Sequence, residues 1–150
     1  MAENEIYTDE YFMKIALQEA QKAFAEEEVP VGAVVVCNNK IIGKGYNQTE
    51  RLVDVTAHAE MIAITAAANY LGSKYLDNCT IYVTLEPCAM CAGALNWAKI
   101  SKVIFGASDA KNGFSTTNTR LLHPKTEVKS NVLKAECETL LKDFFSRLRD

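Results

Sequence analysis

The sequence predicts an α/β domain in which helices alternate with strands along most of the chain. Three observations predict this class: helical periodicity in four stretches, β-branched runs between them, and turn residues where one pattern replaces the next. Strands that are separated by helices favour parallel neighbours in one sheet. We therefore expect a layered α/β domain whose later strands run parallel.

The first third of the chain is predicted to form a helix followed by a β-hairpin. The helix is capped by Thr8 or Asp9 and runs to about Ala25, with apolar residues at helical spacing. Two β-rich segments follow, Val31–Cys37 and Lys40–Tyr46, and the two asparagines between them are a turn signal.

The rest of the chain continues the alternation of helices and strands. The helix at Thr56–Leu71 is apolar nearly all round, so we expect it to be buried on several sides. The last helix is amphipathic, which predicts one face on the core. In chain order, the predicted elements are a helix at Thr56–Leu71 closed by Gly72, a strand at Thr80–Leu85, a helix from Pro87 to about Ala98, a strand at Lys102–Ala107, a loop at 108–126, a short strand at Glu127–Lys129 and a helix at Leu133–Leu148.

The composition and the cysteines bound the class of protein. With 150 residues, 49% of them hydrophobic and 23% charged, the chain is not disordered and can form one core, so we expect a single domain over residues 1–150. Five cysteines, an odd number, argue against a disulfide framework. The acidic N-terminus is unlike a signal peptide, and the longest apolar run, Val31–Cys37, is too short to span a membrane. These features predict a soluble, cytoplasmic protein without a membrane partner.

The net charge of −3 is unevenly distributed along the chain. Residues 1–28 hold eight acidic and two basic residues, a balance of −6, so the rest of the chain carries +3. A strongly basic DNA-coating protein is excluded, whereas a local contact with nucleic acid is permitted.

Two short motifs place metal ligands at the starts of two predicted helices. His58 opens one helix, and Cys88 and Cys91 share one face in the first turn of the other. The positive end of a helix dipole favours thiolates, and two thiolates with one imidazole suit zinc. We predict one zinc ion per chain, bound by His58, Cys88 and Cys91, with the fourth position open to water.

Glu60 is predicted to be the catalytic residue. Residues two apart on a regular helix point to nearly opposite sides, so Glu60 can lie beside the metal only because the helix begins there. Zinc lowers the pKa of a bound water to about 7, and a neighbouring carboxylate can take its proton and pass it to a leaving group. The two motifs together match the signature of zinc deaminases, which predicts attack of hydroxide on an amidine-like ring carbon and loss of ammonia.

Less specific interpretations of the same residues remain open. A structural zinc module would take a fourth ligand from Cys79 or His123, but such a closed site would hold no water for Glu60 to deprotonate. Apart from the two zinc cysteines, we expect Cys37, Cys79 and Cys137 to fill apolar positions.

Several segments resemble those of bacterial tRNA-specific adenosine deaminases, and the likeness covers most of the chain. The motifs around the metal are shared with cytosine and guanine deaminases, whereas the flanking segments are more particular to the tRNA enzymes. The matching segments are Glu28–Val34, Gly45–Asn47, Thr56–Glu60, Tyr82–Ala94 and Phe105–Lys111.

The resemblance implies a fold, an activity and partners. The fold would be a three-layer α/β/α, cytidine-deaminase-like sandwich with a mixed five-stranded sheet. The chain would form a homodimer and convert the wobble adenosine of a tRNA anticodon to inosine, with the anticodon stem-loop as its partner and no DNA. The alternative is a deaminase of a free base or nucleoside, such as guanine or cytosine.

The resemblance also implies which residues bind the substrate. Around the metal they would offer a side-chain hydrogen bond to the flipped base, a pocket border and a backbone N–H group; further out they would border the RNA. The first group is Asn47, Leu85, Glu86 and Ala59, and the second is Asp109, Lys111 and Phe145.

Two segments depart from the family pattern. A proline that usually precedes the histidine motif is replaced in Asp54-Val55-Thr56, which softens the loop before the helix. Residues 114–126 lack a common Asn-His pair, and this segment would help to read the RNA. The chemistry is therefore better supported by the sequence than the substrate.

Overall fold

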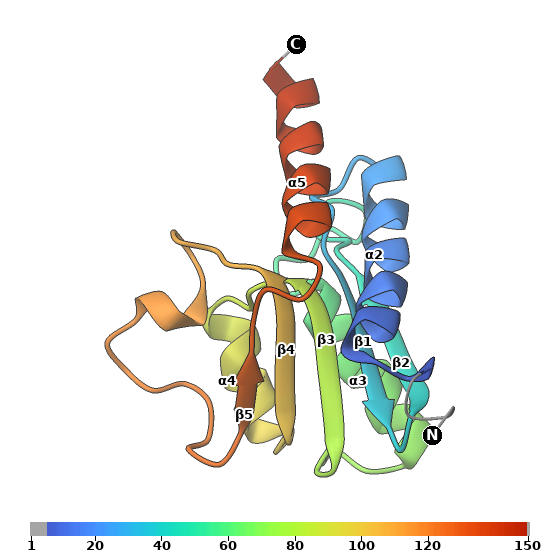
Figure 1. The fold of residues 1–150 in the computed structure, drawn as a ribbon, viewed down its shortest axis with the longest axis vertical. Helices are drawn as coiled ribbons and strands as arrows, with labels where there is room; N and C mark the ends of the chain where they lie inside the picture. The colour runs from blue at the N-terminus through green and yellow to red at the C-terminus, as the bar shows by residue number, and fades with distance from the viewer. Residues whose placement is uncertain (1–5, 150) are drawn as a thin grey trace.

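The structure, a computed structural model, describes residues 6–149 (Figure 1). The acidic N-terminal residues before residue 6, which were compared with a signal peptide above, lie outside the described part. Within it, the predicted alternation of helices and strands is confirmed. The elements are α2 (Asp9–Ala25), β1 (Gly32–Cys37), β2 (Lys40–Tyr46), α3 (Ala59–Leu71), β3 (Cys79–Leu85), α4 (Ala89–Trp97), β4 (Lys102–Ala107), the 3₁₀ turn η1 (Phe114–Thr116), β5 (Glu127–Lys129) and α5 (Lys134–Arg149).

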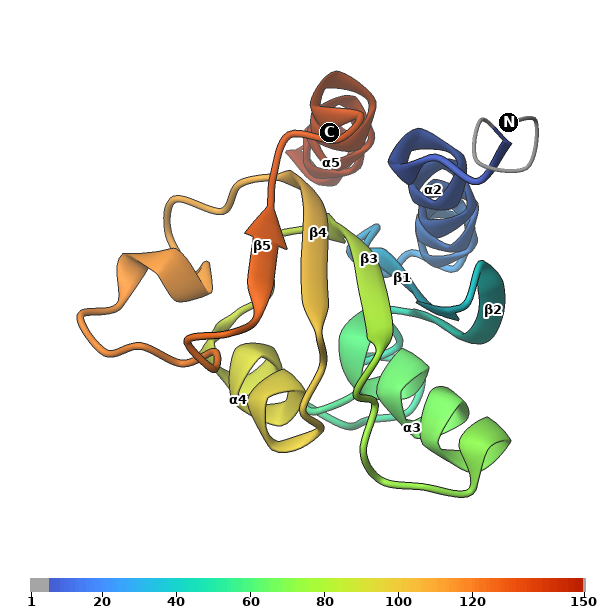
Figure 2. The same ribbon diagram turned by 60° about the horizontal axis from the view of Figure 1, so that its bottom comes forward.

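The strands form one mixed sheet in the order β2-β1-β3-β4-β5. Strand β1 is antiparallel to β2 and β3, whereas β3, β4 and β5 are parallel to one another. Helices α2 and α5 cover one face and α3 and α4 cover the other, as Figure 2 shows. The three-layer sandwich and the parallel later strands are therefore as predicted.

Local sequence signals explain where the first elements begin and turn. The Thr8 hydroxyl accepts a hydrogen bond from the backbone N–H of Tyr11 at 3.1 Å and caps α2. Asn38 and Asn39 have φ angles of 53° and 62°, the left-handed pair that a tight two-residue hairpin requires.

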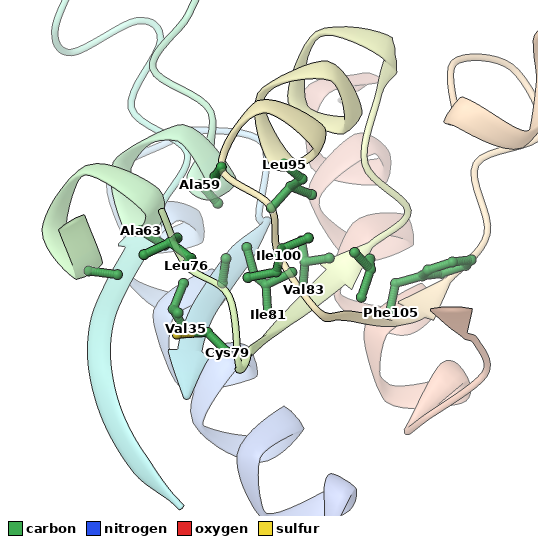
Figure 3. Packing of buried hydrophobic residues seen from close by; sticks show 14 of the residues in the cluster. Val35, Ala59, Ala63, Leu76, Cys79, Ile81, Val83, Leu95, Ile100 and Phe105 are labelled. Atoms are coloured by element: carbon green, nitrogen blue, oxygen red, sulfur yellow. The ribbon is translucent and has the colours of Figure 1, made fainter. Parts of the chain in front are cut away.

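Helix α3 lies directly against β2 because two glycines of that strand allow it. A Cβ atom at Gly43 would collide with the backbone of Ala63, and one at Gly45 with the backbone of Ala59. The first turn of α3 is thereby held close to the sheet. The core between the sheet and helices α3 and α4 is filled by small and branched apolar side chains from both layers (Figure 3).

The starts of α3 and α4 differ from the sequence prediction. Helix α3 begins at Ala59 instead of Thr56, because the Asp54 carboxylate accepts both the N–H and the hydroxyl of Thr56 and holds a turn there. Helix α4 begins at Ala89 instead of Pro87. His58 and Cys88 are therefore the N-cap residues of these helices.

Two further expectations are corrected by the fold. Helix α3 is not buried on several sides, because Thr65, Tyr70 and Leu71 are exposed on its outer face. The segment 108–126 is not entirely loop, since η1 interrupts it. Among the described residues, no helix is both long and apolar enough to cross a membrane.

Candidate metal centre and catalytic pocket

The predicted metal ligands meet where two helices begin on the same side of the sheet. His58 and Cys88 have extended backbones as N-caps, and neither side chain caps its own helix. Both side chains are free to turn inward, and Cys91 follows in the first turn of α4. Their donor atoms all lie within 4.8 Å of one another.

The spacing of these donor atoms fits zinc. The His58 Nδ1 atom lies 3.7 Å from Cys88 Sγ and 3.6 Å from Cys91 Sγ. Tetrahedral zinc with about 2.1 Å to nitrogen and about 2.3 Å to sulfur requires an N···S separation of about 3.6 Å. Among the described residues, the cluster holds three ligands, so the fourth tetrahedral position is not taken by protein.

The two thiols of the cluster differ in pKa because they lie against each other. Hydrogen bonds from Cys91 and His58 lower the pKa of Cys88 to about 3. The hydrogen bond to Cys88 and burial raise the pKa of Cys91. The thiolate is the form of cysteine that binds a metal, so zinc binding would displace any proton on Cys91.

Glu60 lies beside this cluster in a buried position. Its carboxyl group is on the first turn of α3, and the residue is 3% exposed. Burial raises its pKa from 4.5 to about 7. The group therefore exists in both protonation states near neutral pH, as a residue that exchanges protons requires.

A pocket of about 280 Å³ opens in front of the cluster. Of the predicted substrate-binding residues, Lys111 and Phe145 do not line it. Lining the pocket are Val29, Val31, Asn47, Thr49, His58, Ala59, Glu60, Leu85, Glu86, Cys88, Asp109 and Asn112. Five of the seven predicted contacts thus surround one cavity.

Asn47 presents an unsatisfied polar atom to this pocket. Its Nδ2 group donates a hydrogen bond to the Val29 carbonyl at 3.3 Å, which fixes the side chain. Its buried Oδ1 atom has no hydrogen-bond partner among the described residues. A buried acceptor without a partner is costly, so a ligand donor is the natural complement.

Glu86 holds the loop on the far side of the pocket. Its Oε1 accepts the backbone N–H of Asp109 at 3.0 Å, and its Oε2 accepts that of Ser115 at 2.9 Å. The carboxyl group lies against Gly113, where a Cβ atom would overlap it. Both oxygens are thus engaged by the chain, and a direct contact of Glu86 with substrate stays a prediction.

A second carboxylate, whose role was not predicted from the sequence, does the same for the opposite loop. Glu28 is 2% exposed, and its two oxygens accept the backbone N–H groups of Glu50 at 3.1 Å and Arg51 at 2.7 Å. In the sequence, Glu28 stands at the start of the family-like segment Glu28–Val34, to which no contact was assigned. Other lining residues for which no site role was predicted are Val29, Val31, Thr49 and Asn112.

The alternative fourth ligands are not at the site. Cys79 begins β3, at the end of the strand away from the pocket, and its sulfur lies 3.8 Å from the Asp77 carbonyl. His123 accepts the backbone N–H of Lys125 through Nδ1 at 3.0 Å. The described residues therefore do not form a closed structural zinc site.

The α/β/α fold and a three-ligand zinc site beside a buried carboxyl group define a zinc-dependent deaminase. Residues 6–107 match the family model for the cytidine and deoxycytidylate deaminase zinc-binding region. The chain belongs to this family and, within it, to the tRNA-specific adenosine deaminases, because its similarity to such enzymes extends over nearly its whole length.

Three relatives illustrate that similarity. The tRNA-specific adenosine deaminase of Aquifex aeolicus is 47% identical over 146 residues, which is 94% of this chain and 96% of the relative. A solved structure from work on A-to-I editing by tRNA:A34 deaminases is 39% identical, with a TM-score of 0.82 over 87% of this chain and 99% of that one. A guanine deaminase from Bacillus subtilis is 38% identical, with a TM-score of 0.64 over 69% of this chain and 70% of the other.

Proposed function

We propose that this chain converts the wobble adenosine of a tRNA anticodon to inosine. The observation that carries the proposal is that three zinc-binding side chains, the buried Glu60 carboxyl and the unpartnered Asn47 Oδ1 converge on one pocket of about 280 Å³. This volume is close to the lower limit of about 300 Å³ for small-ligand sites, and suits a single base flipped out of its stack.

Glu60 transfers the proton in this reaction. When bound, zinc supplies a water molecule whose pKa is lowered to about 7. The Glu60 carboxyl, with its pKa raised by burial to about 7, accepts a proton in the pocket and returns it to the exocyclic nitrogen of the base. One water is consumed, and ammonia and inosine are the products.

The residues around the base orient it for this transfer. Asn47 Oδ1 accepts a hydrogen bond from the base, and Leu85 forms an apolar part of the pocket wall. The backbone N–H of Ala59, in the first turn of α3, has no helical carbonyl to bond and is free to donate to the substrate.

The outer predicted contacts serve the RNA rather than the base. Asp109 lines the pocket, and its carboxylate accepts the backbone N–H groups of Lys111 and Asn112, which shapes the loop. The exposed Lys111 side chain is then available to a phosphate. Phe145, 43% exposed on α5, offers an aromatic surface on which an unpaired base can stack.

A homodimer would cover apolar side chains that the single chain leaves exposed. Met90 and Trp97 lie seven residues apart on α4, so they share one face, and Trp97 is 82% exposed. Val53 and Val55 are also largely exposed, before α3. The mass of the native protein by light scattering tests this, and Trp97→Asp is expected to shift it from dimer to monomer.

The setting proposed for this reaction is the cytoplasm, in one domain over residues 1–150 with one zinc ion per chain. All five cysteines are free in the structure, which suits a reducing compartment. All three metal ligands lie on segments that connect strands of the same sheet.

Deamination of a free purine is the second candidate. The observation that favours it is the similarity to a guanine deaminase of Bacillus subtilis, which is 38% identical and extends over 69% of this chain. The two candidates differ in what recognises the substrate: a free-base enzyme needs only the pocket, whereas an RNA enzyme also needs contacts outside it.

A substrate panel separates the two candidates. Zinc-loaded protein is incubated with an anticodon stem-loop that has adenosine at the wobble position, with the same stem-loop carrying guanosine there, and with free adenosine, guanine and cytosine. Release of ammonia and the mass of the product are measured. We expect inosine only in the adenosine stem-loop and hardly any turnover of the free compounds; turnover of guanine alone would overturn the assignment.

A further inference from the structure

Cys37 and Cys79 lie directly opposite each other in the sheet, away from the metal centre. Cys37 ends β1 and Cys79 begins β3, and the antiparallel register pairs the two residues. Both side chains belong to the apolar cluster on the α3 and α4 face, in which Figure 3 labels Cys79. They therefore point to the same side of the sheet.

The hydrogen bonds of Cys79 show which kind of cross-strand pair this is. Its N–H donates to the Leu76 carbonyl at 3.1 Å, and its carbonyl accepts the N–H of Ser101 at 3.1 Å. Neither group is directed at β1, so Cys37 and Cys79 form a non-hydrogen-bonded pair. Such pairs have Cα atoms about 4.5 Å apart, within the range of about 4.4 to 6.8 Å that a disulfide spans.

The two thiols differ in how easily a reagent can reach them. Cys37 is half-buried beside the hairpin turn, whereas Cys79 is fully buried. Burial and the neighbouring Cys37 thiol raise the pKa of Cys79 to about 12. Exchange with a reagent therefore starts at Cys37, because attack needs an accessible thiolate.

The geometry points to Cys37 and Cys79 as a reversible redox pair that closes to a disulfide. The oxidant is a small disulfide such as oxidised glutathione. The Cys37 thiolate attacks one of its sulfurs and displaces one glutathione thiolate; Cys79, as it loses its proton, then attacks Cys37 and displaces the second. Two cysteine thiols lose two electrons and two protons, and one glutathione disulfide becomes two thiols.

The bond would enclose a segment of the chain that carries part of the active site. Residues 38–78 include Asn47, His58 and Glu60, and the closed loop restricts this segment in the unfolded chain. Cys79 lies about 20 Å along β3 from the pocket end of the strand, at about 3.3 Å per residue. The oxidised protein is therefore expected to unfold at a temperature several degrees higher, with unchanged deaminase activity.

The test is a redox titration of the zinc-loaded protein with oxidised and reduced glutathione. Free thiols are blocked by alkylation, and peptides are mapped by mass after cleavage by trypsin and chymotrypsin. A cut after Tyr82 separates Cys79 from the metal-binding cysteines. We expect a linked Cys37–Cys79 peptide about 2 Da lighter than the two reduced peptides together, and its reversal by dithiothreitol.

Two variants make the outcome decisive. Cys37→Ser should remove both the linked peptide and the thermal shift. Cys137→Ala should keep both, because no second described cysteine lies with Cys137 in the apolar cluster on the other face of the sheet. Two outcomes would refute the pair. One is a stable mixed disulfide of Cys37 with glutathione while Cys79 can still be alkylated after denaturation, and the other is a disulfide between two chains through Cys37. Neither result depends on the substrate of the enzyme, so the proposed function is tested separately.

Discussion

The pocket has two walls that are built in different ways. The helix wall consists of the first turns of α3 and α4 and carries the metal ligands and Glu60. The loop wall consists of residues 47–51 and 109–115, which contain no α-helix and no strand of the sheet, only the start of the 3₁₀ turn η1. These residues contribute Asn47, Thr49, Asp109 and Asn112 to the pocket. The helix wall places the metal ligands on rigid elements, and the contacts that we propose to recognise the substrate lie on the loop wall.

The loop wall compensates for its lack of helices and strands with two buried carboxylates. Glu28 accepts two N–H groups of one loop, and Glu86 accepts two N–H groups of the other. Each oxygen has one partner, so the charge of each carboxylate is balanced by directed donors. Each loop is therefore held at two backbone positions by one buried side chain.

Replacing Glu60 is the strongest way to separate the chemistry from the rest of the helix wall. Glu60→Ala removes only proton transfer, so we expect kcat to fall by about 10²- to 10⁴-fold while zinc is retained. Turnover of the stem-loop and zinc content by mass spectrometry are measured together. As a control, Thr65→Ala alters an exposed residue of the same helix and should leave both unchanged. Retained turnover in Glu60→Ala would mean that another group moves the proton.

Asn47 tests whether the loop wall recognises the base. Asn47→Ala removes the unpartnered Oδ1 acceptor, and we expect kcat/KM for the stem-loop to fall by about 10- to 100-fold, the worth of one buried hydrogen bond in the transition state. Zinc content should not change. Asn47→Asp keeps an acceptor at this position but loses the donor to Val29, and it separates contact with the base from positioning. A wild-type kcat/KM in Asn47→Ala would remove Asn47 from the site.

Glu86→Gln and Glu28→Gln test the anchoring of the loop wall. Each replaces one carboxylate oxygen with an NH₂ group that faces a backbone N–H, so we expect a loss of about 1 to 3 kcal/mol in the free energy of unfolding by denaturant. We also expect a rise in KM for the stem-loop, since the loop would be less ordered. Glu127→Gln, at an exposed position on β5, is the matched control. If the KM stays constant while stability falls, the carboxylate is structural and does not position the substrate.

The helix wall was accessible to sequence analysis because its residues stand in two short motifs. His58 and Glu60 are two residues apart, and Cys88 and Cys91 are three residues apart. At the start of a helix, these spacings place the side chains of each pair on the same side, so the cluster can be predicted from the sequence. The first residues of α3 and α4 were predicted too early. A turn stabilised by Asp54 precedes α3, and Cys88 is the N-cap of α4 instead of a residue within it. The interior strands followed from their β-branched runs.

The loop wall was only partly accessible, because its contacts join residues that are distant in sequence. Glu28 reaches Glu50, and Glu86 reaches Ser115, across intervals without a repeating pattern. Asn47 was predicted only through its resemblance to a family position, since an asparagine after a strand is otherwise an ordinary turn residue. The pairing of Cys37 with Cys79 likewise depends on strand register, which single-sequence periodicity does not fix.

The smallest effect is expected from a contact that lies outside both walls of the pocket. The Asp9 carboxylate on α2 accepts hydrogen bonds from Lys129 at 2.6 Å and from Tyr82 at 2.9 Å. Burial acts to raise the pKa of Asp9, but these two hydrogen bonds outweigh it and hold the pKa below its ordinary value of 3.8. The carboxylate therefore stabilises the fold above about pH 4, and this contribution is lost as the pH falls through the lowered pKa.

Asp9→Asn should remove this acid-dependent contribution without affecting the pocket. We expect a loss of up to about 1 kcal/mol in the free energy of unfolding near pH 7, as for a partly exposed ion pair. The difference between variant and wild type should shrink as the pH falls below about 4 and through the lowered pKa of Asp9, because the folded wild type then takes up a proton on this carboxylate. Glu10→Gln, one residue further along the first turn of α2, controls for the helix dipole. A difference that stays constant with pH would assign the effect of Asp9 to packing, and a change in kcat/KM would show that the sheet transmits this contact to the pocket.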